Sequence, residues 1–119
     1  MIMISVSRSW RKYRMYVRVN MVEFNSHDGM HEALTIWRKN AAQWMTGAQL
    51  LFTMKTSEKS AMYISVYKSQ EDAENALDGR QKYVDAMGDL VHDVFYHEGD
   101  MDFAFLNPEM LKDEMVDSL

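Results

Sequence analysis

Residues 61–76 read AMYISVYKSQEDAENA, and within this stretch a strand pattern gives way to a helix pattern. Over residues 61–67, apolar side chains alternate with aromatic or polar ones, a period of two that is typical of a half-buried β-strand. Ser69 can cap a helix, and the acidic residues that follow it suit the positive end of a helix dipole. The stretch therefore predicts a strand that leads directly into a helix.

The chain on either side of this junction repeats the same two patterns. Alternation predicts strands at residues 16–24, 49–55, 61–67 and 91–98, with a further short strand at 103–106. Apolar residues at three- and four-residue steps predict helices at 30–45 and 70–87, and a short acidic helix at 108–118. This order, βαββαβ, is the ferredoxin-like arrangement, with one antiparallel sheet and two helices on one face. We therefore predict an α+β ferredoxin-like domain at 15–106, between a basic N-terminal extension at 1–14 and an acidic C-terminal tail at 107–119.

Composition narrows the function classes. The 119 residues suit one domain, and the absence of cysteine excludes disulfides, thiolate zinc sites and cysteine nucleophiles. The net charge of -5 argues against nucleic acid as a partner, and no apolar run approaches the ~20 residues of a membrane helix. The chain also lacks a glycine-rich phosphate loop. We expect a cytoplasmic protein that needs no cofactor or metal and binds neither nucleic acid nor membrane.

One face of the predicted sheet mixes aromatic and polar side chains. Its members are Tyr16, Arg18, Asn20, Val22, Phe24, Tyr63, Ser65 and Tyr67. This set is too aromatic to lie comfortably in water and too polar for a sealed core. We therefore expect the helices to cover the opposite face, with Met21 and Met62 in the helix–sheet core. The mixed face would hold a ligand cavity, which a second copy of the sheet would close in a homodimer.

The region 16–98 resembles the antibiotic biosynthesis monooxygenase-like (ABM) members of the dimeric α+β barrel superfamily. The resemblance rests on Asn20 in the first strand, on Trp37 in an aromatic first helix and on the junction ISVYKSQEDA at 64–73. It implies a homodimeric barrel and one of several activities: cofactor-independent oxygenation of aromatic compounds, quinol-type oxygenation or haem degradation. The haem-degrading pattern needs a histidine in the second helix, and residues 70–88 contain none, so haem degradation is not expected.

Asn20 and two tyrosines are the first candidates for the chemistry. Asparagine is disfavoured in mid-strand, and in relatives an asparagine at about this place hydrogen-bonds the substrate or an oxygen species. The alternative is a structural amide. Tyr67 stands where relatives often carry tryptophan, and Tyr63 precedes it on the same face. Both phenols could bind a substrate hydroxyl or stack on an aromatic ligand, or simply pack in a dimer interface.

The remaining candidates are one arginine, two aromatic residues and two histidines. Arg18 could fix a carboxylate or phenolate, or pair with an acidic residue of the protein. Phe24 and Trp37 complete the predicted substrate-binding set, although Trp37 also has the spacing of a core residue. His92 and His97 lie five apart in the last strand and point to opposite faces, so at most one could serve as a general base in the cavity. Non-catalytic histidines are the alternative.

Two functions follow from these observations. The first is a cofactor-independent monooxygenase-like protein acting on a small aromatic or quinol-like substrate. The second is a non-catalytic dimeric module that binds a small apolar ligand or a partner protein. Asn20 and a histidine converging on one open cavity would favour the enzyme. A cavity filled by Tyr63, Tyr67 and Phe24 would argue against it.

Overall fold

The structure, a computed structural model, describes residues 14–112. In chain order its elements are β1 (Tyr16–Phe24), α2 (His27–Trp44), β2 (Ala48–Ser57), β3 (Ser60–Tyr67), α3 (Gln70–Asn75), α4 (Leu77–Met87), the 3-10 helix η1 (Gly88–Leu90), β4 (Val91–Asp100) and the 3-10 helix η2 (Pro108–Leu111). The predicted ferredoxin-like βαββαβ fold is confirmed. The second predicted helix is divided into α3 and α4 at Ala76.

Local signals in the sequence begin and end these elements. The Ser26 side chain caps α2 by accepting a hydrogen bond from the Gly29 amide, and Ser69 caps α3 through the Asp72 amide. Gly47 and Gly88 follow α2 and α4 with positive φ values of 88° and 50°, which glycine adopts without a steric penalty. The strand-to-helix junction therefore forms where the sequence predicts it.

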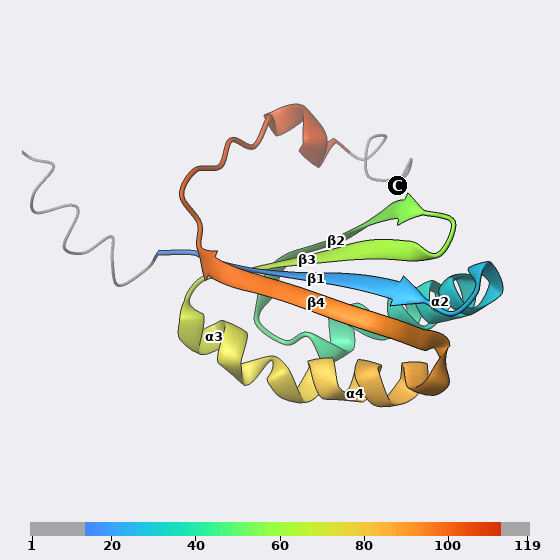
Figure 1. Cartoon of the computed structure of the whole chain (residues 1–119). Helices are drawn as coiled ribbons and strands as arrows, with labels where there is room; N and C mark the ends of the chain where they lie inside the picture. Colours follow the sequence, from blue (N-terminus) through green and yellow to red (C-terminus); the bar gives the residue numbers. More distant parts are fainter. Residues whose placement is uncertain (1–13, 113–119) are drawn as a thin grey trace, which may run out of the picture.

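The four strands form one antiparallel sheet in the order β2-β3-β1-β4. Figure 1 shows α2, α3 and α4 together on one side of this sheet. In the register, Asn20 at the middle of β1 lies opposite Tyr63 of β3 and Tyr96 of β4. Residues directly opposite each other in a sheet point to the same face, so these three side chains form one row.

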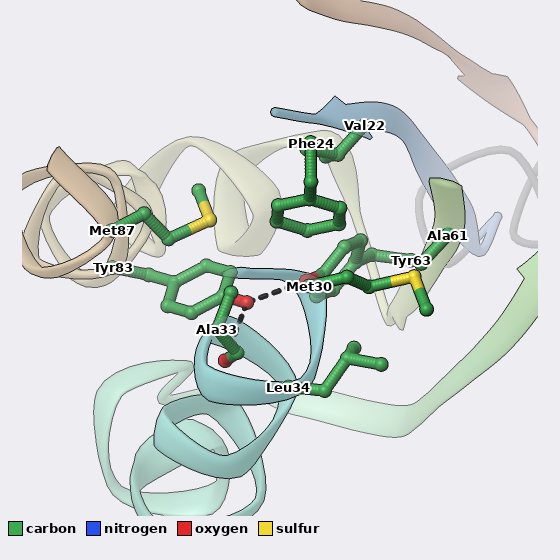
Figure 2. Close-up of a cluster of buried hydrophobic side chains, with 9 residues drawn as sticks. All are labelled: Val22, Phe24, Met30, Ala33, Leu34, Ala61, Tyr63, Tyr83 and Met87. Carbon is green, nitrogen blue, oxygen red and sulfur yellow. Dashed lines mark hydrogen bonds between the residues drawn. The ribbon is translucent and has the colours of Figure 1, made fainter. Parts of the chain in front are cut away.

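The prediction of which face the helices cover was wrong. Phe24 and Tyr63, from the mixed face, pack against α2 and α4 in the main core cluster, as Figure 2 shows, whereas Met21 is 40% exposed. The helices bury the aromatic side chains of the mixed face and remove their apolar area from water. The polar members can follow them because they find partners there, as Arg18 does with Glu98. Met30 and Met87 lie in this core as expected.

The opposite face of the sheet is apolar and is not covered by α2, α3 or α4 (Figure 1). We call it the open face; it comprises Val17, Val19, Met21, Leu50, Phe52, Met54, Met62, Ile64, Val66, Phe95 and His97. Several of these side chains are half exposed or more, and Phe95 reaches 60%. Met62, like Met21, therefore belongs to the open face and not to the helix–sheet core.

The C-terminal segment differs in part from its prediction. β4 continues to Asp100, and residues 101–107 form no regular strand, although a strand was predicted at 103–106. The Asn107 side chain caps the short helix η2, and the remainder of the predicted acidic helix lies outside the described residues, as does most of the basic extension. Within residues 14–112, none of the helices combines the length and hydrophobicity that a membrane crossing requires.

Candidate functional site

A cavity lies between the sheet and the helices, on the mixed aromatic and polar face. About 480 Å³ of its space is free of protein atoms, and this figure includes open solvent at the cavity mouth. Its polar lining comes from Asn20, Ser65, Arg80 and the phenols of Tyr63 and Tyr83; Trp37, Met45 and Met87 belong to its apolar wall. The lining includes no histidine and no carboxylate. No three His, Asp or Glu side chains of the described chain are grouped to hold a metal ion.

Asn20 and Arg80 form the polar centre of this cavity. The Asn20 Oδ1 atom accepts hydrogen bonds from Arg80 Nε at 3.2 Å and Nη2 at 3.1 Å. A guanidinium group has only donors, so this contact fixes the orientation of the asparagine amide, with Nδ2 turned away from Arg80. The guanidinium also lies over the ring of Tyr96, 5.4 Å from its centroid. Within residues 14–112 no carboxylate is close enough to form an ion pair with Arg80, although its charge helps to lower the pKa of Glu98.

Two phenols and an indole form the aromatic wall. Tyr83 Oη donates to the Ala33 carbonyl at 2.9 Å, and the Tyr63 and Tyr83 hydroxyls are 2.5 Å apart (Figure 2). Trp37 meets Tyr63 edge to face, with ring centroids 5.4 Å apart. Burial raises the pKa of Tyr63 to about 12 and moves that of Tyr83 further above the ordinary phenol value. Both groups are therefore neutral at pH 7 and act as hydrogen-bonding groups.

A close contact between α2 and α4 sets the position of Arg80. Gly79 packs so tightly on the C-terminal end of α2 that a Cβ atom there would lie 1.9 Å from the Trp44 carbonyl oxygen. Only glycine permits such an approach. The next residue along α4 is Arg80, and the contact holds it over the middle of β1, beside Asn20.

Arg18 lies outside the cavity lining. It is 2% exposed, donates from Nε to Glu98 Oε2 at 2.9 Å and from Nη1 to the Ala73 carbonyl at 3.0 Å, and so joins β1 to β4 and α3. Tyr16 Oη donates to the other Glu98 oxygen at 2.8 Å. Partial burial alone would raise the pKa of Glu98, but the hydrogen bonds from Tyr16 and Arg18 outweigh it and lower that pKa. The alternative interpretation of Arg18, pairing with an acidic residue, describes its position.

Four other predicted residues also lie away from the cavity lining. Tyr67 is completely buried in a second core cluster, and its hydroxyl has no hydrogen-bond partner among the described residues. Phe24 packs in the main core cluster. His97 is on the open face, opposite Val19, and His92 is exposed near the start of β4. Of the eight predicted residues, the cavity thus brings together Asn20, Tyr63 and Trp37.

Arg80 and Tyr83 are the cavity residues that sequence reasoning did not single out. Both fall on the apolar stripe of the second predicted helix, with Ala76 and Met87. A cation on such a stripe is a detectable signal, because a buried charge requires a partner and Asn20 on the sheet is one. Tyr83 has the spacing of an ordinary core residue, and nothing in the sequence distinguishes it.

Comparison with known proteins supports the fold. No protein-family model matches the chain, and no curated protein matches it in sequence. Among solved structures, it is similar to a dimeric ferredoxin-like protein from an uncultured marine organism, with a TM-score of 0.65 and 12% identity over 79% of this chain and 93% of that one. SnoaB, a cofactor-independent oxygenase from Streptomyces nogalater, gives a TM-score of 0.63 at 12% identity, covering 79% of this chain and 99% of its own. A monooxygenase from Streptomyces coelicolor, determined with the ligand nanaomycin D, gives 0.62 at 10% identity, covering 81% and 95%.

These neighbours share their fold with the chain at identities that carry no residue-level correspondence. Two structures described as putative antibiotic biosynthesis monooxygenases, from Chloroflexus aurantiacus and Nitrosomonas europaea, are among them, which agrees with the resemblance seen in the sequence. The chain therefore has the ferredoxin-like fold of the antibiotic biosynthesis monooxygenase-like proteins.

Proposed function

We propose that the protein is a cofactor-independent monooxygenase-like protein that binds a small aromatic or quinol-like substrate in the cavity between sheet and helices. The observation that carries this proposal is the Asn20–Arg80 pair, a cation and an amide placed inside an otherwise aromatic and apolar cavity. The fold is consistent with it, since SnoaB is a cofactor-independent oxygenase.

The cavity suits chemistry in which the substrate itself supplies the electrons. An electron-rich aromatic that has lost a proton can reduce O₂, so that a ring CH₂ becomes C=O, one oxygen atom enters the product and the other leaves as water. Arg80 would stabilise the anion, and the Asn20 amide would orient it. Trp37 and Tyr63 would hold the ring, and the apolar wall would strengthen these interactions by excluding water. Because the lining holds no histidine or carboxylate, the substrate must ionise readily on its own.

The same absence of a histidine or carboxylate that could act as a general base favours a second candidate. A non-catalytic module that binds a small aromatic ligand needs the cavity and the Asn20–Arg80 pair but no base. The two candidates predict the same binding and differ in oxygen consumption.

Oxygen uptake and ligand binding, measured on the same samples, separate the two candidates. The full chain is tested with a panel of anthrones, quinols and flavonols, and binding is followed by quenching of tryptophan fluorescence. We expect uptake with the wild type, a loss of at least tenfold in Arg80→Met and Asn20→Ala, and no change in Lys82→Met, an exposed cation on the same helix. Binding without uptake across the panel would identify the non-catalytic module. Neither uptake nor binding would reject both candidates.

We also propose that the open face pairs with a second copy of the chain. Its rows run across all four strands, for example Phe52, Ile64, Val19 and His97, and exposed apolar side chains gathered on one face are typical of an interaction surface. Apolar side chains of the C-terminal segment are exposed as well, with Phe103 at 81%. The marine ferredoxin-like protein is dimeric.

Light scattering during size exclusion tests the pairing. We expect a mass twice the 14.0 kDa of the chain at micromolar concentration. Phe52→Lys should produce the monomer, because the new charge would lie within the proposed interface without a partner. Thr53→Lys is the matched control, since Thr53 is exposed and its side chain points to the other face of β2. A wild type that remains monomeric would refute the pairing.

A further inference from the structure

We propose that the cavity selects its ligand by hydrogen-bond polarity, accepting an oxygen anion or carbonyl at Asn20 and Arg80 and a hydroxyl group at Tyr63. The ligand class is therefore an aromatic molecule with a hydroxyl at one end and an anionic or carbonyl oxygen at the other. This inference rests on the proposed ligand-binding function of the cavity and adds the direction of each hydrogen bond.

The hydrogen bonds that join Tyr63, Tyr83 and the Ala33 carbonyl can run in only one direction. The Ala33 carbonyl can only accept, so the single hydroxyl hydrogen of Tyr83 points to it. Tyr83 Oη must then accept from Tyr63, whose own hydrogen is committed to that bond, as the dashed lines in Figure 2 indicate. Tyr63 keeps a free lone pair and no free hydrogen, so toward a ligand it can only accept. Burial keeps both phenols protonated at neutral pH and preserves this direction.

The polar centre has the opposite character. Arg80 offers donors alone, and its contact with Oδ1 occupies the acceptor side of the Asn20 amide. What remains for a ligand is the Nδ2 donor pair of Asn20 and the free Nη1 group of Arg80. Asn20 and Tyr63 are directly opposite each other in neighbouring strands and both line the cavity, so a single ligand can contact both side chains.

Three naphthoates that differ in one substituent test this directly. Isothermal titration calorimetry at pH 7 compares 6-hydroxy-2-naphthoate, its methyl ether 6-methoxy-2-naphthoate and unsubstituted 2-naphthoate. The carboxylate should accept hydrogen bonds from Asn20 and Arg80, and the hydroxyl should donate a hydrogen bond to Tyr63. We expect the wild type to bind the hydroxy compound roughly 3- to 10-fold more tightly than either of the others, the value of one hydrogen bond.

Two variants distinguish hydrogen-bond direction from shape. Tyr63→Phe removes the acceptor and should abolish the preference for the hydroxy compound. Tyr83→Phe leaves Tyr63 in place but releases its hydrogen, so the preference should shift toward the methyl ether, which can only accept. Shape alone would leave the preference unchanged in both variants. That result would overturn the proposal, as would a wild type that binds none of the three naphthoates or does not prefer the hydroxy compound.

A third variant tests the other end. Asn20→Asp has nearly the same shape but replaces the Nδ2 donors with an acceptor and neutralises Arg80. We expect roughly tenfold or greater loss of all three naphthoates, against an unchanged affinity in the Lys82→Met control. Thermal melts confirm that each variant is folded. If the expected polarity is found without oxygen uptake, the oxygenase proposal alone fails; if uptake occurs without this polarity, the present inference alone fails.

Discussion

Replacing Gly79 with alanine tests how the helices position the cavity. In the structure, the new Cβ would be 1.9 Å from the Trp44 carbonyl oxygen and 2.6 Å from its carbonyl carbon. Ordinary contact begins at 3.4 Å, so α2 and α4 must separate by about 1.5 Å. Both obstructing atoms belong to the backbone and cannot turn aside as a flexible side chain would.

The expected cost follows from two opposing contributions. Overpacking of this kind costs about 3 kcal/mol, at the upper end of its usual range because backbone must move. Alanine is a better helix former than glycine by about 1 kcal/mol, which offsets part of that cost. The free energy of unfolding should therefore fall by about 2 kcal/mol, a large share of the ~5–15 kcal/mol that keeps a domain folded.

Urea denaturation of the two proteins measures this difference. With a slope of about 2 kcal/mol per molar urea, the midpoint should fall by about 1 M. Gly99→Ala is the control, because a Cβ at Gly99 meets nothing within 4 Å and its midpoint should hardly change. Naphthoate binding should weaken in Gly79→Ala, since Arg80 moves with its helix. An unchanged midpoint and unchanged binding would show that α4 does not rest on the Trp44 carbonyl, and the reasoning that places Arg80 beside Asn20 would fail.

The structure predicts the outcomes of three further substitutions. Glu98→Gln removes the carboxylate partner of the buried Arg18 and should lower the free energy of unfolding by about 1 kcal/mol at pH 7, since Glu98 itself is partly exposed to solvent. Because folding lowers the pKa of Glu98, this contribution is complete above the unfolded value of 4.5 and is lost as pH falls through the folded pKa, so the two proteins should converge in acid. Folding raises the pKa of Tyr63 from 10.0 to about 12. The resulting contribution of Tyr63 to the free energy of unfolding is fully present below pH 10 and is lost as pH rises from 10 to 12. The decline in stability over this range should therefore be shallower in Tyr63→Phe. Tyr67→Phe removes a buried hydroxyl that has no partner among the described residues and should stabilise the protein by about 1 kcal/mol without altering oxygen uptake, whereas a loss of uptake would restore Tyr67 to the catalytic set.

The order of the elements could be predicted because it depends on short-range patterns. Alternation over residues 61–67, the Ser69 cap and the glycine that follows each long helix are all local, and each acts as expected in the structure. The division between α3 and α4 and the short loop between β2 and β3 alter boundaries without changing the fold.

The faces of the sheet could not be assigned from such local patterns. The strands present two alternating sets of side chains, and either set could face the helices. The polar side chains of the mixed face led to the prediction that the helices would leave that face uncovered. That argument failed because the partners of the polar groups are distant in sequence: Arg18 pairs with Glu98, and Asn20 with Arg80. A polar residue is acceptable under the helices once such a partner is present. The histidines of the last strand were considered for the cavity on the same uncertain assignment.

The sequence nevertheless indicates where the cavity lies, because polar or small residues interrupt the apolar pattern on three elements. Two apolar clusters fill the space between sheet and helices, one around Phe24 and Met30 and the other around Tyr16 and Tyr67. Between the two clusters, the core-facing residues of β1, β3 and α4 change from apolar to polar or small.

On β1 the interruption is Asn20, on β3 it is Ser65, and on the helical side it is Gly79 with Arg80. Asn20 lies opposite Tyr63 and Ser65 lies opposite Arg18, so the polar residues occupy two adjoining rows of the sheet, with Arg80 beside Asn20 on the helical side. The cavity opens at this polar band. A core designed only for stability would carry apolar side chains at these positions, because a buried cation and amide rarely exceed well-packed hydrophobic residues in stability. The band is therefore consistent with the ligand-binding function that we propose for the cavity.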